Sequence, residues 1–134
     1  MMKILQPPGW AKPRGYSNGI AAKGGTTVFV AGQVAFNSKG VIEEKAFSGQ
    51  FRQTLRNTLA VLAEAGGKPE HIVRMTWYIL DKKEYLGVIK EVGAAYRELI
   101  GRHYPAMAVV QAAGLMADEA KLEIETTAVI PEAR

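Results

Sequence analysis

The last third of the chain constrains the fold most, because apolar and polar side chains alternate over residues 121–130. Side chains switch face at every residue of a β-strand, so this alternation predicts a strand with one apolar and one polar face. Residues 106–113, just upstream, are almost wholly apolar and predict a buried strand joined to it by a turn. The apolar face would carry Leu122, Ile124, Thr126 and Ala128, and the polar face Lys121, Glu123, Glu125 and Thr127.

The rest of the chain carries further strand and helix patterns. β-Branched and aromatic residues at 26–31 predict a strand covered on both faces, and Gly24-Gly25 before it predicts a hairpin turn. Apolar residues that recur every three or four positions predict two helices. In order, we expect an extended arm over residues 1–14, strands at 20–22 and 26–31, a helix from about 44–48 to 65, a strand at 71–80, a helix capped by Asp81 and ending at Gly101, and the two final strands.

The element order β-β-α-β-α-β-β predicts an α+β fold in which two helices cover one face of a mixed β-sheet. The 134 residues have the size of a single domain, taken as 1–134. The strand at 71–80 would place Val73, Met75, Trp77 and Ile79 on one face, and Ile72, Arg74, Thr76, Tyr78 and Leu80 on the other. Two helices cannot cover both faces of this sheet, so we expect the chain to oligomerise.

Composition narrows the function. The net charge is +4, but the 17 basic residues are scattered and do not interleave with aromatic ones, so nucleic-acid binding is not favoured. The absence of cysteine excludes disulfides and thiolate chemistry. No apolar run approaches the roughly 20 residues of a membrane span, and the first residues do not form a signal peptide, so we expect the cytoplasm.

Few residues are candidates for catalysis or for binding a metal or ligand. The two histidines, His71 and His103, lack the spacing of metal ligands, and no nucleophile or phosphate-binding motif occurs, so we expect neither metal nor cofactor. Glu123 and Glu125 share a face; they are either a solvated strand surface or a group that orients water or a substrate nitrogen. Tyr16 and Gln33 are polar residues beside glycines. Either Tyr16 packs on the body and Gln33 caps a turn, or both side chains face a ligand.

Several segments together resemble the YjgF/RidA family of small trimeric proteins, which includes reactive imine and enamine deaminases. The resemblance covers nearly the whole chain and implies a chorismate-mutase-like fold, with three sheets packed into a central barrel and a ligand cleft at each subunit junction. The segments are Gly-Tyr-Ser-Asn at 15–18, Val-Phe-Val-Ala-Gly-Gln at 28–33, Gln-Thr-Leu-Arg-Asn-Thr-Leu-Ala-Val-Leu-Ala-Glu-Ala-Gly at 53–66, His-Ile-Val-Arg-Met-Thr-Trp-Tyr-Ile at 71–79, Tyr-Pro-Ala at 104–106, and Leu-Glu-Ile-Glu-Thr-Thr-Ala-Val at 122–129.

The resemblance also implies site residues. The family's water-orienting glutamate falls on Glu123, its pocket tyrosine on Tyr16, and its glycine and glutamine after the second strand on Gly32 and Gln33. The arginine that holds the substrate carboxylate falls on Met107, and a thioether cannot replace a bidentate guanidinium–carboxylate pair.

Three hypotheses follow from this departure. The first is a divergent deaminase or other hydrolase of small imines that uses Glu123 and a water, either on a less acidic substrate or with Arg74 or Arg102 as a substitute clamp. The second is a non-catalytic trimer that binds a small, more apolar ligand beside Met107. The third, least favoured because the charge is scattered, is an endoribonuclease. The expected partners are a small-molecule ligand at the subunit interface and the other copies of a homotrimer; nucleic acid is not favoured, and a membrane is not expected.

Overall fold

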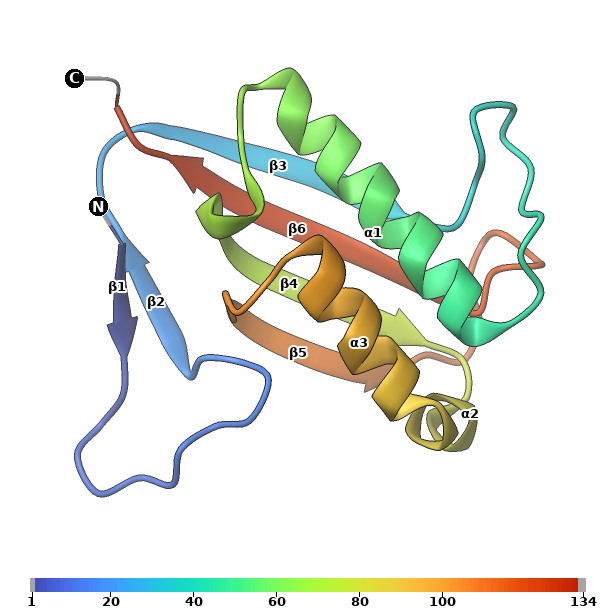
Figure 1. Ribbon diagram of the computed structural model, residues 1–134, viewed down its shortest axis with the longest axis horizontal. Helices are drawn as coiled ribbons and strands as arrows, with labels where there is room; N and C mark the ends of the chain where they lie inside the picture. The colour runs from blue at the N-terminus through green and yellow to red at the C-terminus, as the bar shows by residue number, and fades with distance from the viewer. Residues whose placement is uncertain (1, 133–134) are drawn as a thin grey trace.

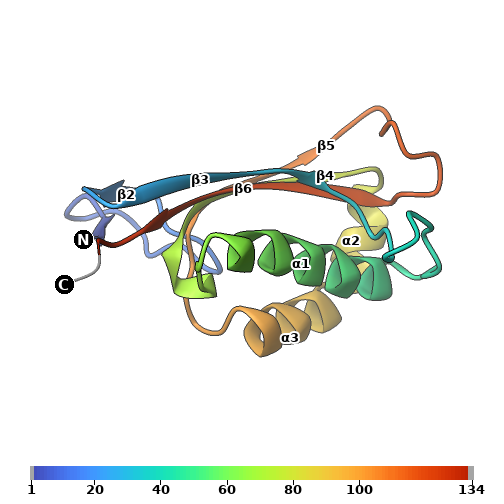
Figure 2. The ribbon, with the colours of Figure 1, turned by 90° about the horizontal axis from the view of Figure 1, so that it is seen from above.

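Two layers make up the protein: a four-stranded sheet and, on one of its faces, the helices (Figures 1 and 2). This computed structural model describes residues 2–132. The elements are β1 Met2–Leu5, β2 Gly19–Ala22, β3 Thr26–Gln33, α1 Phe47–Glu64, a 3-10 turn Pro69–His71, β4 Ile72–Ile79, α2 Lys82–Gly87, α3 Ile89–Leu99, β5 Ala106–Gln111 and β6 Leu122–Ile130. The expected α+β, chorismate-mutase-like fold with helices on one face of a mixed sheet is confirmed.

The strand order in the main sheet is β3-β6-β4-β5, with β4 and β5 parallel and the other pairs antiparallel. The prediction that 106–113 is a buried strand next to 121–130 was wrong, because β4 lies between β5 and β6. β5 is an edge strand, and its Val109 and Val110 are 38% and 41% exposed. The reason is connectivity. The helices after β4 form a crossover that returns the chain parallel to β4, and β5 takes the edge of β4 that β6 does not occupy.

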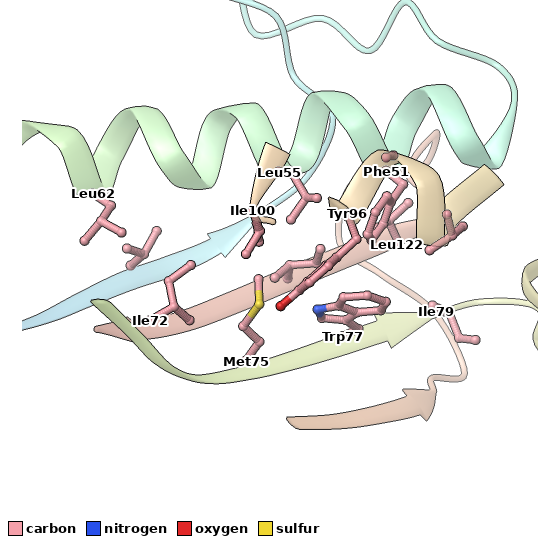
Figure 3. Packing of buried hydrophobic residues seen from close by; sticks show 14 of the residues in the cluster. Phe51, Leu55, Leu62, Ile72, Met75, Trp77, Ile79, Tyr96, Ile100 and Leu122 are labelled. Atoms are coloured by element: carbon pink, nitrogen blue, oxygen red, sulfur yellow. The ribbon is translucent and has the colours of Figure 1, made fainter. Parts of the chain in front are cut away.

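The core lies between the helices and the sheet (Figure 3). Phe51 and Leu55 of α1 point toward Trp77 and Met75 of β4, and Leu62 points toward Ile72; Phe51 and Met75 are fully buried. Burial of each large side chain contributes about 1.5–3 kcal/mol, which is what holds these short elements together. The predicted alternation in β6 is confirmed, since Leu122, Ile124, Thr126 and Ala128 are all buried.

A bulge corrects the expected faces of β4. Ile72 pairs with Ala128 and Arg74 with Thr127, so Val73 is an extra residue with no partner on β6. One inserted residue reverses the faces on either side of it. Ile72 therefore faces the core and is fully buried, although the uninterrupted alternation placed it with Arg74 on the opposite face.

The second predicted helix is broken in two. Asp81 begins it as expected, and its carboxylate accepts from the backbone N–H groups of Lys83 and Glu84 at 2.9 and 3.2 Å. At Val88 the backbone leaves the helical region, with φ −122° and ψ 24°. Gly87, a weak helix former, ends α2 there, and α3 begins at Ile89.

The expected extended arm over residues 1–14 begins with a short strand, β1. β1 pairs antiparallel with β2 in a separate two-stranded sheet. Gly24 and Gly25 both have positive φ, as a glycine turn requires, but the strands that they connect do not pair with each other. β2 pairs with β1 instead.

The face of the main sheet opposite the helices is open within one chain (Figure 2). Phe29 of β3 is 79% exposed there, so the expectation that this strand is covered on both faces was wrong for the single chain. A phenylalanine so exposed in the middle of a strand is typical of a surface that another molecule covers. Within the part of the chain that the structure describes, no helix has the length and apolar character needed to cross a membrane.

Candidate functional site

A cavity of about 490 Å³ lies between α3 and the β4–β5 edge of the sheet. Its walls come from the loop before β2, from β4, α2 and α3, from the loop after α3 and from β5, so six separate segments meet at it. Ligand pockets commonly measure about 300–1,000 Å³. The cavity is therefore large enough for a small organic molecule.

Aromatic side chains form much of this cavity, which we call the aromatic cavity. Tyr96 and Tyr104 stack with ring centroids 5.6 Å apart and planes 7° apart, and the Tyr96 hydroxyl donates to the His103 carbonyl at 2.5 Å. The Trp77 indole is buried, and its N–H has no acceptor within residues 2–132. Five aromatic residues line it: Tyr16, Trp77, Tyr85, Tyr96 and Tyr104.

Two contacts hold Tyr16 in place. The Ser17 backbone N–H donates to the Pro105 carbonyl at 3.0 Å, and the Ser17 hydroxyl donates to the Tyr104 carbonyl at 2.5 Å. Ser17 also forms a parallel bridge with Ala106, at the start of β5. The loop before β2 is thereby attached to β5, and Tyr16 and Met107 line the same cavity.

Met107 faces the helix layer and not the open face of the sheet. It pairs with Met75 of β4 in parallel register, and side chains at paired positions leave a sheet on the same side. Met107 is half-buried and packs on the main core. It is therefore both part of the hydrophobic packing and a wall of the aromatic cavity.

The arginines suggested as substitute clamps do not reach this cavity. Arg74 lines a different hollow, of about 330 Å³, on the open face of the sheet beside Glu125. Arg102 is exposed and is not among the residues that line the aromatic cavity. Arg14 and Arg97 line it instead, and the sequence pattern indicated neither of them.

Glu123 and Gly32 form a second group on the open face of the sheet, and Gln33 follows Gly32 at the end of β3. In β3, Val30 pairs with Thr126 and Gln33 with Ile124, so Ala31 and Gly32 both lie opposite Glu125 as a bulge. The Glu123 side chain lies over Gly32, where a Cβ would collide with its carboxylate. The Gln33 side chain donates to the Ala31 carbonyl at 3.1 Å and thus holds the bulge.

The two glutamates of β6 differ in their contacts. The Glu125 carboxylate accepts a 2.7 Å hydrogen bond from the Tyr78 hydroxyl, and this bond raises the pKa of Tyr78 above its ordinary value. Glu123 is half-buried, whereas Glu125 is exposed. Glu125 is thus engaged with its neighbour on β4, and Glu123 lies against a glycine backbone.

The predicted site residues therefore fall into two groups within one chain. Tyr16 and Met107 lie at the aromatic cavity on the helix side, and Glu123 lies over Gly32 on the open face, while Gln33 pairs with the core residue Ile124 and is not on that face. The roles assigned to these residues stay predictions. A single chain does not unite them, because the sheet separates the two groups.

Both histidines make structural contacts. His103 Nε2 lies 2.6 Å from the Ile72 carbonyl, and His71 Nδ1 accepts from the Lys68 backbone N–H at 2.9 Å. These contacts tie the ends of β4 and its neighbours together. These hydrogen bonds account for both histidines without a catalytic or metal-binding role.

The buried tyrosines predict a loss of stability at high pH. Burial raises the pKa of Tyr96 above its ordinary value of 10.0, and burial raises that of Tyr85 in the same direction. Above about pH 10 the unfolded chain loses the Tyr96 proton first, so the free energy of unfolding should fall by at most about 1.4 kcal/mol per pH unit for this group.

Urea unfolding between pH 8 and pH 11 measures this fall. Stability should be constant below the unfolded-state pKa, and Tyr96→Phe should flatten the decrease above it. A wild-type stability that does not change up to pH 11, or a variant as pH-sensitive as the wild type, would contradict the assignment to Tyr96.

Comparison with known proteins finds relatives in sequence and in fold. A family profile described as Endoribonuclease L-PSP matches residues 10–130. A RutC family protein of Synechocystis is 34% identical over 133 residues, which are 97% of this chain and 98% of that protein. A 2-iminobutanoate/2-iminopropanoate deaminase of Salmonella typhimurium is 32% identical over 108 residues, 78% of this chain and 80% of that protein. The solved structure of the Rid-family protein YyfB from Yersinia pestis, of unknown function, has a TM-score of 0.82 at 28% identity and covers 96% of this chain and 98% of its own.

Proposed function

The chain belongs to the YjgF/RidA family, and we propose that it is a divergent imine or enamine deaminase, with its clefts between the subunits of a homotrimer. Relatives at 32% identity bear the name 2-iminobutanoate/2-iminopropanoate deaminase. The observation that carries the proposal is the split of the site residues into two groups on opposite faces of the sheet.

The split fits a composite site. The open sheet face, with Phe29 79% exposed, needs a covering surface, and a second copy of the chain supplies one. In this arrangement the Glu123 group of one subunit borders the aromatic cavity of the next. Each cleft then has an apolar wall with Tyr16 on one side and a carboxylate over an open glycine backbone on the other.

The chemistry that this cleft can perform is hydrolysis of a C=N bond. Glu123 accepts a proton from a water molecule, whose oxygen adds to the imine carbon. That proton passes to the nitrogen and gives a carbinolamine. The proton of the new hydroxyl group then moves to the nitrogen as well, the C–N bond breaks, and a ketone and ammonia result. Among the described residues the Glu123 carboxylate has no hydrogen-bond partner, whereas Glu125 accepts a hydrogen bond from the Tyr78 hydroxyl. Glu123 is therefore the glutamate suited to this general-base role. Gly32 leaves the space that this carboxylate occupies, because a Cβ there would collide with it.

A second candidate is a non-catalytic trimer that binds a small apolar ligand in the same cleft. One observation favours it: Met107 packs on the core and presents a thioether to the aromatic cavity, where the family's arginine would hold a carboxylate. The cavity wall would then select a ligand by its apolar surface. Steady-state hydrolysis of freshly generated 2-imino acids distinguishes the candidates, since only the first predicts turnover.

Met107→Arg tests the missing clamp. If the cleft is a deaminase cleft without its arginine, the variant should hydrolyse small 2-imino acids more efficiently than the wild type, by about tenfold or more, because a charged hydrogen bond contributes about 1.5–3 kcal/mol. Hydrolysis and melting temperature should be measured together. Met107→Leu is the control, because it keeps the volume and apolar character of the wall.

If Met107 serves only the core, the arginine side chain lacks a partner and the melting temperature falls without any gain in turnover. That result would favour the binding protein. A wild-type rate already equal to that of the named deaminases would mean that the cleft does not need an anion clamp at position 107.

A further inference from the structure

We propose that Arg14 and Arg97 form the anion-binding end of the aromatic cavity, and that its ligand is a carboxylate with an aromatic or comparably large apolar side chain. This inference rests on the proposed function, because it specifies the substrate class of the same cleft. In this chain, two arginines on other elements would take the place of the family's single arginine, whose position on β5 is Met107 here.

The charged side chains that line the aromatic cavity are both positive. Arg14 lies in the loop before β2 and Arg97 in the last turn of α3, and they are the only charged side chains that line the aromatic cavity within the described residues. Neither arginine has an ion-pair partner among residues 2–132, whereas Arg52 and Lys121 are each paired with a glutamate. Two unpaired guanidinium groups at one cavity favour an anion there.

Arg97 is placed over the cavity by a glycine. A Cβ on Gly93 would lie 3.3 Å from Arg97 Nη1, so the guanidinium lies against Gly93, one turn earlier on α3. Gly93 also lines the cavity. The small residue lets the arginine fold back along the helix toward the aromatic walls.

The size and lining of the cavity specify the rest of the ligand. An apolar cavity of about 150 Å³ already holds a benzene molecule, and this one measures about 490 Å³. Its walls are tyrosine and tryptophan rings together with Ile89, Val92 and Val109. A carboxylate of two or three carbons would leave most of this surface uncovered, while a phenyl group would bury against it and gain about 25 cal/mol for each Å² removed from water.

Binding of three matched probes tests the proposal by calorimetry: 3-phenylpropanoate, its neutral amide 3-phenylpropanamide, and propanoate. We expect the phenyl acid to bind about tenfold more tightly than the amide, since two exposed guanidinium groups contribute up to about fivefold each. Propanoate should bind more weakly still. The preference for the acid should shrink as salt is raised from 0.05 to about 0.5 M, and the affinity for the amide should not change.

The variant Arg14→Gln/Arg97→Gln should lose the preference for the acid, by about tenfold in affinity, and keep the affinity for the amide. Arg56→Gln, an exposed arginine of α1 that lines neither cavity, is the matched control and should behave as the wild type. Equal binding of acid and amide by the wild type, no preference for phenylpropanoate over propanoate, or acid binding unaffected in the double variant would each overturn the proposal.

Hydrolysis assays separate this proposal from the proposed function. If the wild type binds the phenyl acid through the arginines but hydrolyses neither 2-imino-3-phenylpropanoate nor 2-iminopropanoate, the catalytic function fails and the anion site stands. If it hydrolyses both imino acids with the same efficiency, and the double variant leaves KM unchanged, the function stands and the anion site fails.

Discussion

Replacing Glu123 by glutamine is expected to lower imine hydrolysis by about 100-fold or more, because the amide cannot accept the proton of the attacking water. The side chain keeps its length, and it lies half-buried over Gly32 without a hydrogen-bond partner among the described residues, so the melting temperature should hardly change. The measurement is kcat and KM for freshly generated 2-imino acids. The loss should appear mainly in kcat, since Glu123 acts on water and not on the substrate's apolar part.

Glu125→Gln is the matched control for this experiment. It makes the same chemical change two residues further along the same strand and on the same face, but its carboxylate is engaged by the Tyr78 hydroxyl at 2.7 Å. Its kcat should stay within about threefold of the wild type, the range of an indirect effect. Equal losses in both variants, or a larger loss in Glu125→Gln, would mean that the wrong carboxylate has been assigned.

The second large effect concerns Phe29, whose replacement by lysine should convert the proposed trimer into monomers. Phe29 is 79% exposed on the open face of β3, and in a closed trimer the change would occur three times. Each subunit would lose about 1.5–3 kcal/mol of apolar burial and would also place an unpaired charge in the interface. Light scattering at micromolar concentration measures the mass of wild type and variant.

Hydrolysis should fall together with the mass, because Glu123 and Tyr16 would then belong to separate molecules. Val61→Lys is the control: Val61 is 41% exposed on α1, in the helix layer, and its replacement should leave the mass unchanged. A wild-type monomer, or a Phe29→Lys variant that stays trimeric, would contradict the composite site.

The main elements of the fold were predictable because their signals are local. The alternation in β6, the apolar stripe of α1 and the Asp81 cap each depend on neighbours within a few residues, and the structure has all three. The errors came where a local signal was ambiguous. A single extra residue, Val73, reversed the face of Ile72, and an apolar run at 106–113 looked the same for a central strand and for an edge strand.

The candidate site could be predicted only in part. The resemblance supplied Tyr16, Met107, Gly32, Gln33 and Glu123, but no sequence pattern indicated that they would separate onto two faces of the sheet. Arg14 and Arg97 were missed for the same reason. They are 83 positions apart by their numbering, and only the packing of α3 beside the loop before β2 brings them to one cavity.

The sequence by itself determined which segments become strands and helices, and which face of β6 is apolar, because side-chain periodicity and capping act over a few residues. The tertiary structure alone decided the neighbours: β4 between β5 and β6, Tyr16 attached to β5 through Ser17, and Arg97 folded over Gly93. Those contacts join residues far apart in the chain. They follow from how the whole helix layer packs on the sheet, since chain connectivity and burial of the common core select one arrangement among many that the local signals permit.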